Sequence, residues 1–317
     1  MTRPLVYVTR LLPAPVMEAL MARFEFTVPP AASPPSREIV LSGVQDAQAL
    51  IPTLSERIDA ELLDGAPSLR VVANYAVGYN NIDLEAARAK GVIVTNTPDI
   101  LTDTTADLAW ALLLAVARRI PEGHRLVQQN EWTGWEPRQL LGSDVHGKTL
   151  GIIGMGRIGQ AVARRAAGFG MPVIYHSRGP RRNGPAVWEA VSFEDVLQQS
   201  DFLSLHVPLT SETHHLIGST QLGMMRPTAY LINTARGPIV DEAALVAALT
   251  AGQLAGAGLD VYEREPDVHP GLRTLWNVVT LPHVGSATLA TRIRMGMVCL
   301  ENVVAVLEGR TPPNRVA

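Results

Sequence analysis

The sequence predicts a two-domain α/β protein in which helices pack on parallel β-sheets. Short apolar runs, typical of buried strands, alternate with helical stretches along most of the chain. The chain has 317 residues, which suits about two domains of ordinary size. Hydrophobic residues make up 47% of it but aromatic residues only 5%, so Ala, Val, Leu and Ile must fill the cores.

A first α/β series runs from the N-terminus to about residue 98. We expect strands at residues 5–9, 49–51, 71–74 and 92–95 and a helix at 14–22. A final helix at about 289–307 follows the last strand of the chain and is expected to return to this domain. The smaller domain is therefore predicted as a discontinuous, flavodoxin-like α/β substrate domain formed by residues 1–98 and 289–317.

The second domain is predicted to span residues 99–288. An apolar helix at 108–120, with Pro121 at or just after its end, is expected to link the domains or to lie in a subunit interface. Further strands are expected at residues 149–153, 173–176, 202–206, 229–233, 257–260 and 278–281. Strands that alternate with helices in this way indicate a doubly wound parallel sheet of the Rossmann type.

A glycine-rich turn follows the first strand of this second series. Gly154, Gly156 and Gly159 match the spacing G-x-G-x-x-G, and an amphipathic helix begins within the motif. The first glycine permits a tight turn, the second lets the backbone approach a pyrophosphate, and the third lets the helix pack on the strand. The whole turn is predicted to bind a dinucleotide and also includes Met155, Arg157 and Ile158.

The end of the next strand indicates which dinucleotide is bound. Sites specific for NAD place an acidic residue there, on the ribose 2′-hydroxyl. This chain has Ser177 and Arg178 instead, followed by Arg181 and Arg182, and no acid before Glu189. A serine and an arginine can hold a 2′-phosphate, so the sequence favours NADPH/NADP+, with NADH as a possible second cofactor.

Three titratable residues follow the last three predicted strands, where ligands bind in open α/β sheets. Arg236 can hold a substrate carboxylate and polarise a ketone. His283 can donate a proton, and a nearby carboxylate such as Glu265 favours its protonated form. Taken singly, each is equally well explained by a salt bridge, a solvated loop or a buried histidine, so spacing alone leaves their catalytic role open.

These segments resemble the D-2-hydroxyacid dehydrogenase family, and the resemblance covers nearly the whole chain. Residues 72–83 resemble the substrate loop of the family. Residues 95–98, 101–107 and 132–137 resemble the glyoxylate/hydroxypyruvate reductase branch. The resemblance implies Arg236, Glu265 and His283 as catalytic residues and a small 2-keto or 2-hydroxy acid as substrate. Formate dehydrogenases carry glutamine where Glu265 stands, which argues against formate.

The resemblance also implies binding residues and an assembly. The substrate would contact Leu54, the backbone of Val77 and Gly78, Arg236 and His283, and Trp135 from the neighbouring subunit of a homodimer. Besides the turn, Ser177, Arg178 and Arg181, the cofactor would contact Thr105, Val207, Pro208, Thr213, Thr234, Ala235, Arg236, Asp260, His283 and Gly285.

Composition argues against several other classes of protein. The net charge is −3 without a basic patch, so nucleic acid is not an expected partner. The N-terminus lacks a signal-peptide pattern and the longest apolar stretch is too short for a membrane span. The single cysteine, Cys299, fits a reducing compartment, so we expect a cytoplasmic enzyme. His206, His214 and His215 lack the partners of a metal site, and no metal is expected.

Two alternatives stay open from the sequence. One is another D-2-hydroxyacid dehydrogenase, of the lactate or phosphoglycerate type, that uses NADH. The other is a dinucleotide-sensing corepressor on the same fold, which would bind cofactor without turnover.

Overall fold

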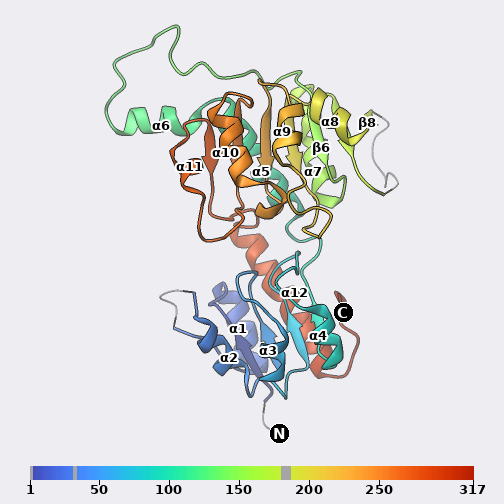
Figure 1. Ribbon diagram of the computed structural model, residues 1–317. Helices are drawn as coiled ribbons and strands as arrows, with labels where there is room; N and C mark the ends of the chain where they lie inside the picture. The colour runs from blue at the N-terminus through green and yellow to red at the C-terminus, as the bar shows by residue number, and fades with distance from the viewer. Residues whose placement is uncertain (1–2, 31–33, 180–186) are drawn as a thin grey trace. The chain divides into compact units, whose positions relative to one another are not determined.

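The structure, a computed structural model, describes residues 3–30, 34–179 and 187–317 (Figure 1). It divides into two compact units, Met1–Leu101 with Ser286–Ala317, and Thr102–Gly285. The predicted domain limits lie three residues from these boundaries. Each unit has one sheet in which all paired strands are parallel, which confirms the predicted fold class.

The sheet of the first unit has the strand order β2-β1-β3-β4-β5, the flavodoxin-like order. Its strands are β1 (Leu5–Val8), β2 (Glu25–Thr27), β3 (Ala49–Ile51), β4 (Val71–Ala73) and β5 (Ile93–Thr95). Strand β2 was not predicted, because this edge strand contains no fully buried residue and so has no apolar run. The other strands lie where they were predicted, within a residue or two at each end.

Helices cover both faces of this first sheet. They are α1 (Ala14–Arg23), α2 (Arg37–Val44), α3 (Ala60–Asp64), α4 (Leu84–Ala89) and α12 (Leu289–Leu307). Side chains alternate along a strand, and in β1 Val6 and Val8 join the core under α1 and α12. Tyr7 points to the opposite core, under α2 and α3. The unit is therefore closed by α12, from the far end of the chain.

The sheet of the second unit has the order β12-β11-β10-β9-β6-β7-β8. Its strands are β6 (Leu150–Ile153), β7 (Val173–His176), β8 (Trp188–Ala190), β9 (Phe202–Leu205), β10 (Tyr230–Asn233), β11 (Gly256–Leu259) and β12 (Val278–Thr280). After β6 the chain adds β7 and β8 on one side of this strand and then returns to add β9 on its other side. Ligands bind at such a switch point, beyond the carboxyl ends of the strands.

Two helical layers cover this second sheet (Figure 1). The core on one face contains residues of α5 (Thr102–Ala117) and α7 (Arg157–Ala166). The core on the other contains residues of α8 (Phe193–Gln199), α9 (Ser219–Met224), α10 (Glu242–Thr250) and α11 (Pro270–Thr274). Short 3₁₀ helices are η1 (Ala167–Phe169) and η2 (Gly237–Ile239). No helix in the described ranges is long and apolar enough to cross a membrane.

The helix predicted at residues 108–120 differs from the structure in two ways. The observed helix α5 ends at Ala117, and Pro121 lies in the first turn of a second helix, α6 (Ile120–Gln128). Proline suits that position because the first N–H groups of a helix have no acceptor within the helix, so the N–H that proline lacks is not needed there. Eight residues of α5, among them Trp110, are buried and most pack into the core of this unit. The helix begins at Thr102, where the second unit starts, so it follows directly on the link from the first unit.

Candidate active site

The glycine-rich turn joins β6 to α7, as predicted, and its three glycines meet different constraints. Gly154 has a φ of 98°, and an added Cβ would lie 2.6 Å from the carbonyl carbon of His206. A Cβ on Gly159 would lie 2.2 Å from the carbonyl oxygen of Gly154. A Cβ on Gly156 would meet nothing within 4 Å. The first and third glycines are thus needed for packing, whereas the second leaves the helix end open.

This open helix end fits the pyrophosphate of a dinucleotide. Gly156 is the N-cap of α7, and the first N–H groups of a helix lack intrahelical acceptors and favour an anion. Val207 and Pro208 follow β9, the neighbour of β6 at the switch point.

Two threonine hydroxyls predicted to contact the cofactor differ in their partners. Beyond β10, the hydroxyl of Thr234 is buried and has no described hydrogen-bond partner. The Thr213 hydroxyl, by contrast, donates to the carbonyl of Pro208 at 2.6 Å and so shapes the loop.

The end of β7 carries the residues predicted to read the ribose. Ser177 and Arg178 are both exposed, directly after the strand. A guanidinium nitrogen of Arg178 lies 3.8 Å from a carboxylate oxygen of Glu212. The sequence does not indicate this acid as a neighbour of Arg178, because it comes from the loop after β9, far along the chain. Arg181 and Arg182 lie outside the described residues.

The three predicted catalytic residues follow β10, β11 and β12, three neighbouring strands of the sheet. Nδ1 of His283 lies 2.7 Å from a carboxylate oxygen of Glu265. Arg236 is half-buried, and its charge acts on the Glu265 carboxylate. The Glu265 carboxylate therefore interacts with both an imidazole and a cation, and Nε2 of His283 has no partner among the described residues.

Electrostatics favour a charged carboxylate in this group. Burial alone would raise the pKa of Glu265. The hydrogen bond and charge of His283, the N–H of Tyr262 and the charge of Arg236 together outweigh burial and hold the pKa below its ordinary value. Burial lowers the pKa of Arg236, and Glu265 opposes that change. An arginine stays protonated in proteins, so the group contains a fixed cation beside an ionised acid.

The backbone of His283 is held by Asp260. His283 has a φ of 53°, a left-handed conformation that is unfavourable for a residue with a Cβ. The two carboxylate oxygens of Asp260 accept hydrogen bonds from the N–H groups of Val284 and Gly285, both at 2.8 Å. The carbonyl of Gly285 accepts a hydrogen bond from the hydroxyl of Thr105 at 3.1 Å. Asp260, Thr105 and Gly285, all predicted to bind cofactor, thus lie together.

Asn233, which the sequence analysis did not single out, shapes the turn before Arg236. Its side-chain amide donates to the carbonyl of Arg236 at 2.9 Å and accepts from the N–H of Ala235 at 3.0 Å. Asn233 is buried at the end of β10 and looks like any other strand residue in the sequence. Its hydrogen bonds hold the main chain that carries the guanidinium.

In the first unit, the predicted substrate loop at residues 72–83 has three successive carbonyl groups that all accept hydrogen bonds from the chain. The carbonyls of Ala76, Val77 and Gly78 accept hydrogen bonds from the N–H of Thr97 and the side-chain amides of Asn96 and Asn74, at 3.0, 2.8 and 2.8 Å. A trans peptide points its N–H away from its C=O. The N–H groups of Val77 and Gly78 consequently face the other way, and neither donates a described hydrogen bond.

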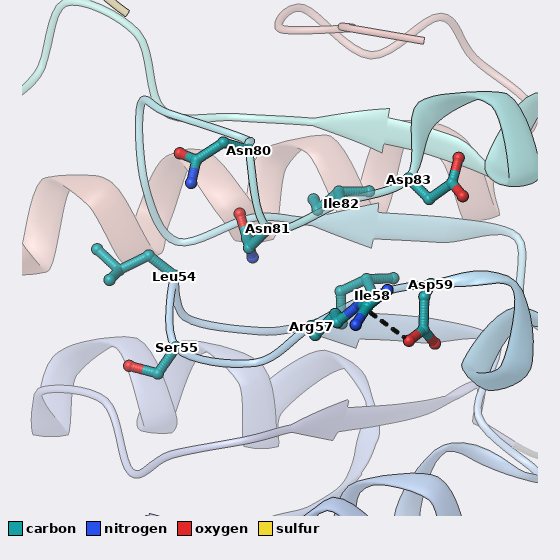
Figure 2. A pocket seen from close by; sticks show the side chains of 9 residues that line it. All are labelled: Leu54, Ser55, Arg57, Ile58, Asp59, Asn80, Asn81, Ile82 and Asp83. Carbon is teal, nitrogen blue, oxygen red and sulfur yellow. Dashed lines mark ion pairs between the residues drawn. The ribbon is translucent and has the colours of Figure 1, made fainter. Parts of the chain in front are cut away.

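Leu54, the predicted hydrophobic substrate contact, borders a hollow in the same unit (Figure 2). Figure 2 shows Leu54 and Asn80 at one end of the hollow and Asp59 and Asp83 at the other. The side chain of Asn81 lies between them and donates to the carbonyls of Thr53 and Glu56 at 3.2 and 3.1 Å. Asn81 therefore ties the segment that carries Leu54 to the loop that follows Gly78.

Trp135 lies in a long segment without helix or strand after α6, and 79% of its surface is exposed. Figure 1 shows this segment extending away from the sheet of its unit. Helix α6 itself has no buried residue. The exposed large hydrophobic residues of this part of the chain are Ile120, Val127, Trp132, Trp135 and Leu141.

Comparisons with known proteins agree with this geometry. Residues 110–285 match the model of the D-isomer specific 2-hydroxyacid dehydrogenase NAD-binding domain. A glyoxylate reductase of Thermococcus kodakarensis is 51% identical, with 99% of this chain and 96% of the relative covered. The crystal structure of the TT0316 protein of Thermus thermophilus is 50% identical with a TM-score of 0.93, and covers 99% of this chain and 100% of that one.

A third relative was solved with ligands. It is the NADPH-dependent glyoxylate/hydroxypyruvate reductase of Sinorhizobium meliloti in complex with NADP and malonate, 36% identical with a TM-score of 0.88. The match covers 100% of this chain and 97% of that one. With both its fold and its full length matched, the chain belongs to the D-isomer specific 2-hydroxyacid dehydrogenase family, as its motifs predict.

Proposed function

We propose that this dehydrogenase reduces glyoxylate to glycolate and hydroxypyruvate to D-glycerate, with NADPH as the preferred cofactor. The observation that carries the proposal is the 2.7 Å pair of His283 and Glu265, with Arg236 on a neighbouring strand end of the same sheet. The names of the relatives supply the substrate: one is a glyoxylate reductase and another a glyoxylate/hydroxypyruvate reductase.

In the proposed reaction, the chain's own residues bind the keto acid and supply the proton. Arg236 holds the carboxylate and polarises the carbonyl group. His283, charged and held through Nδ1 by Glu265, donates a proton from Nε2 to the carbonyl oxygen. The nicotinamide cofactor supplies the hydride that the carbonyl carbon accepts. The product is a 2-hydroxy acid, and both hydrogens of the reduction are accounted for.

We propose that the first unit recognises the substrate carboxylate and the size of the substrate. The N–H groups of Val77 and Gly78 suit a carboxylate because two neighbouring peptide donors match its two oxygens. Leu54 would give one side of the site an apolar surface, which suits a small 2-keto acid. The division of roles is thus a substrate domain in the first unit and a cofactor domain in the second.

The preference for NADPH rests on the end of β7. Arg178 is exposed and only 3.8 Å from Glu212, in an ion pair that a 2′-phosphate could replace. Ser177 stands where an acid would repel that phosphate. NADH lacks the phosphate and would bind more weakly, without being excluded.

A cytoplasmic location suits such a cofactor and the single buried thiol of Cys299.

We further propose a homodimer in which Trp135 enters the active site of the neighbouring subunit. Exposed hydrophobic residues gather on α6 and on the segment after it, where a monomer would leave them in water. A second copy of the chain would cover them.

A panel of cofactors and substrates tests the proposed function. Initial rates are measured with NADPH and NADH on glyoxylate, hydroxypyruvate, pyruvate and phosphohydroxypyruvate. We expect the highest kcat/KM with NADPH and glyoxylate or hydroxypyruvate. Equal or higher values with the other two acids would indicate a different dehydrogenase of the family. The His283→Ala variant should bind NADPH without turnover, whereas a corepressor would show no turnover in the wild type either.

A further inference from the structure

Two separate loops of the second unit carry the charged pair of the site. Arg236 precedes η2 and α10, whereas Glu265 lies between β11 and α11. These loops must keep a fixed spacing for Arg236 and Glu265 to act together. The first residue of α10, Glu242, lies where the loops meet. Its side chain is buried, with 8% of the residue exposed, although it is an acid.

Glu242 and Glu263 exchange hydrogen bonds between the two loops. The N–H of Glu263 donates to a carboxylate oxygen of Glu242 at 2.8 Å. The N–H of Glu242 donates to a carboxylate oxygen of Glu263 at 3.0 Å. The backbone of His269 also acts on the Glu242 carboxylate and lowers its pKa. Glu242 therefore interacts with the chain on both sides of Glu265.

The two loops are also in direct backbone contact. A Cβ added to Gly237, the residue after Arg236, would lie 1.8 Å from the carbonyl carbon of Tyr262. The N–H of Tyr262 in turn donates to the Glu265 carboxylate at 3.1 Å. A movement of one backbone must therefore displace the other, and the Glu242–Glu263 pair sets their alignment.

An ordinary helix cap does not explain Glu242. The N-cap of α10 is Asp241, whose carboxylate already accepts the N–H of Ala244 at 3.0 Å. Burial raises the pKa of Glu242, and the charge of Glu263 adds to the increase. The acid thus has an energetic cost at this position, which the backbone hydrogen bonds from the neighbouring loop offset.

We propose that Glu242 is a positioning residue that aligns the loop of Glu265 with the loop of Arg236. Glu263 is its counterpart, and Nε2 of His215 lies 2.8 Å from the Glu263 carboxylate as a third support. Neither glutamate touches a reacting atom. The inference rests on the proposed function, because it assigns Glu242 an effect on the step that Arg236, Glu265 and His283 carry out.

Two variants of Glu242 and one control test this role in the full-length enzyme. Glu242→Ala removes the acceptor, whereas Glu242→Gln keeps one oxygen for the backbone N–H groups. Glu194→Ala removes an exposed glutamate from the first turn of α8 and serves as the matched control. Each protein is assayed with glyoxylate well below its Tm, and its Kd for NADPH is measured by protein fluorescence.

We expect Glu242→Ala to lower kcat by about 10- to 100-fold, the effect of a small misplacement of reacting groups. The Kd for NADPH should change less than about twofold, because the glycine turn follows a different strand. Glu242→Gln should recover most of the kcat, and Glu194→Ala should match the wild type. A wild-type kcat in Glu242→Ala, or a parallel loss of NADPH binding, would overturn the proposal.

Hydrogen exchange separates this inference from the proposed function. The amides of Glu263 and His269 should exchange faster in Glu242→Ala than in the wild type, without any substrate. If the wild type does not reduce glyoxylate, the proposed function has failed but faster exchange still supports the alignment of the loops. Unchanged exchange at both amides would contradict the inference, whatever the substrate is.

Discussion

Glu265 accepts a hydrogen bond from Nδ1 of His283 at 2.7 Å, and this contact fixes which ring nitrogen can serve the substrate. An imidazole whose Nδ1 is held by a carboxylate presents Nε2 as its only other titratable atom. The strained backbone of His283, pinned through Asp260, limits the directions in which that atom can point. The short contact with Glu265 thus orients the imidazole that is proposed to donate the proton.

The pH dependence of stability tests the charge of Glu265. Its pKa in the folded protein is lowered, so its stabilising effect is present above the ordinary pKa of glutamate, about 4.3, and is lost as the pH falls through the lower folded value. Glu265→Gln cannot ionise. The free energy of unfolding should therefore be lower in Glu265→Gln than in the wild type near neutral pH, and the difference should shrink in acid. A difference that grows in acid would contradict this assignment.

Asn96 tests the orientation of the substrate loop at residues 72–83, which is proposed to bind the substrate carboxylate. Asn96→Ala removes the amide that holds the Val77 carbonyl, so the N–H of Gly78 loses its fixed direction. We expect KM for glyoxylate to rise by about 10-fold, the equivalent of one hydrogen bond to a charged group, with a smaller change in kcat. Asn302→Ala is the control, since it removes another hydrogen-bonded asparagine of this unit, one that is buried and bonded to Asn314. An equal rise in KM in both variants would indicate general loosening of the unit.

The sequence predicted the parts of the site that depend on local pattern. The glycine turn and the strand ends with Arg236, Glu265 and His283 follow from spacing and from apolar runs, and they occur where the pattern placed them. The edge strands β2 and β8 were not predicted. Two of the three residues in each strand are exposed, so neither strand shows an apolar run. Pro121 was misjudged because a proline can end one helix or begin another.

The supporting contacts could not be predicted, because they join segments distant in the chain. Asn96 reaches Val77 across 19 positions, and Glu242 reaches Glu263 across 21. Glu212 lies near Arg178 only because the loops after β7 and β9 approach each other in space. A polar residue of this kind carries no spacing signal, so only the folded chain identifies its partner.

Cofactor preference is tested at the end of β7. Replacing Ser177 by Asp and Arg178 by Gln should lower kcat/KM for NADPH and raise it for NADH, because the new acid repels a 2′-phosphate and accepts a 2′-hydroxyl. We expect the ratio of the two values to change by about 100-fold or more, from the loss of charge-assisted hydrogen bonds. Glu212→Gln should act oppositely and favour NADPH, since it releases Arg178. An unchanged ratio in the double variant would refute the 2′-phosphate site.

Mixed dimers test whether Trp135 acts on the neighbouring subunit. Trp135→Ala should keep the dimer intact in light scattering but raise KM, because the exposed side chain would no longer reach its partner's substrate. His283→Ala alone should be inactive. When the two variants are unfolded and refolded together, a mixed dimer has one site with both residues intact and one site with neither, if the tryptophan acts across the interface. Activity with a wild-type KM should then appear after mixing. Activity that only sums the separate variants would show that Trp135 acts within its own subunit or not at all.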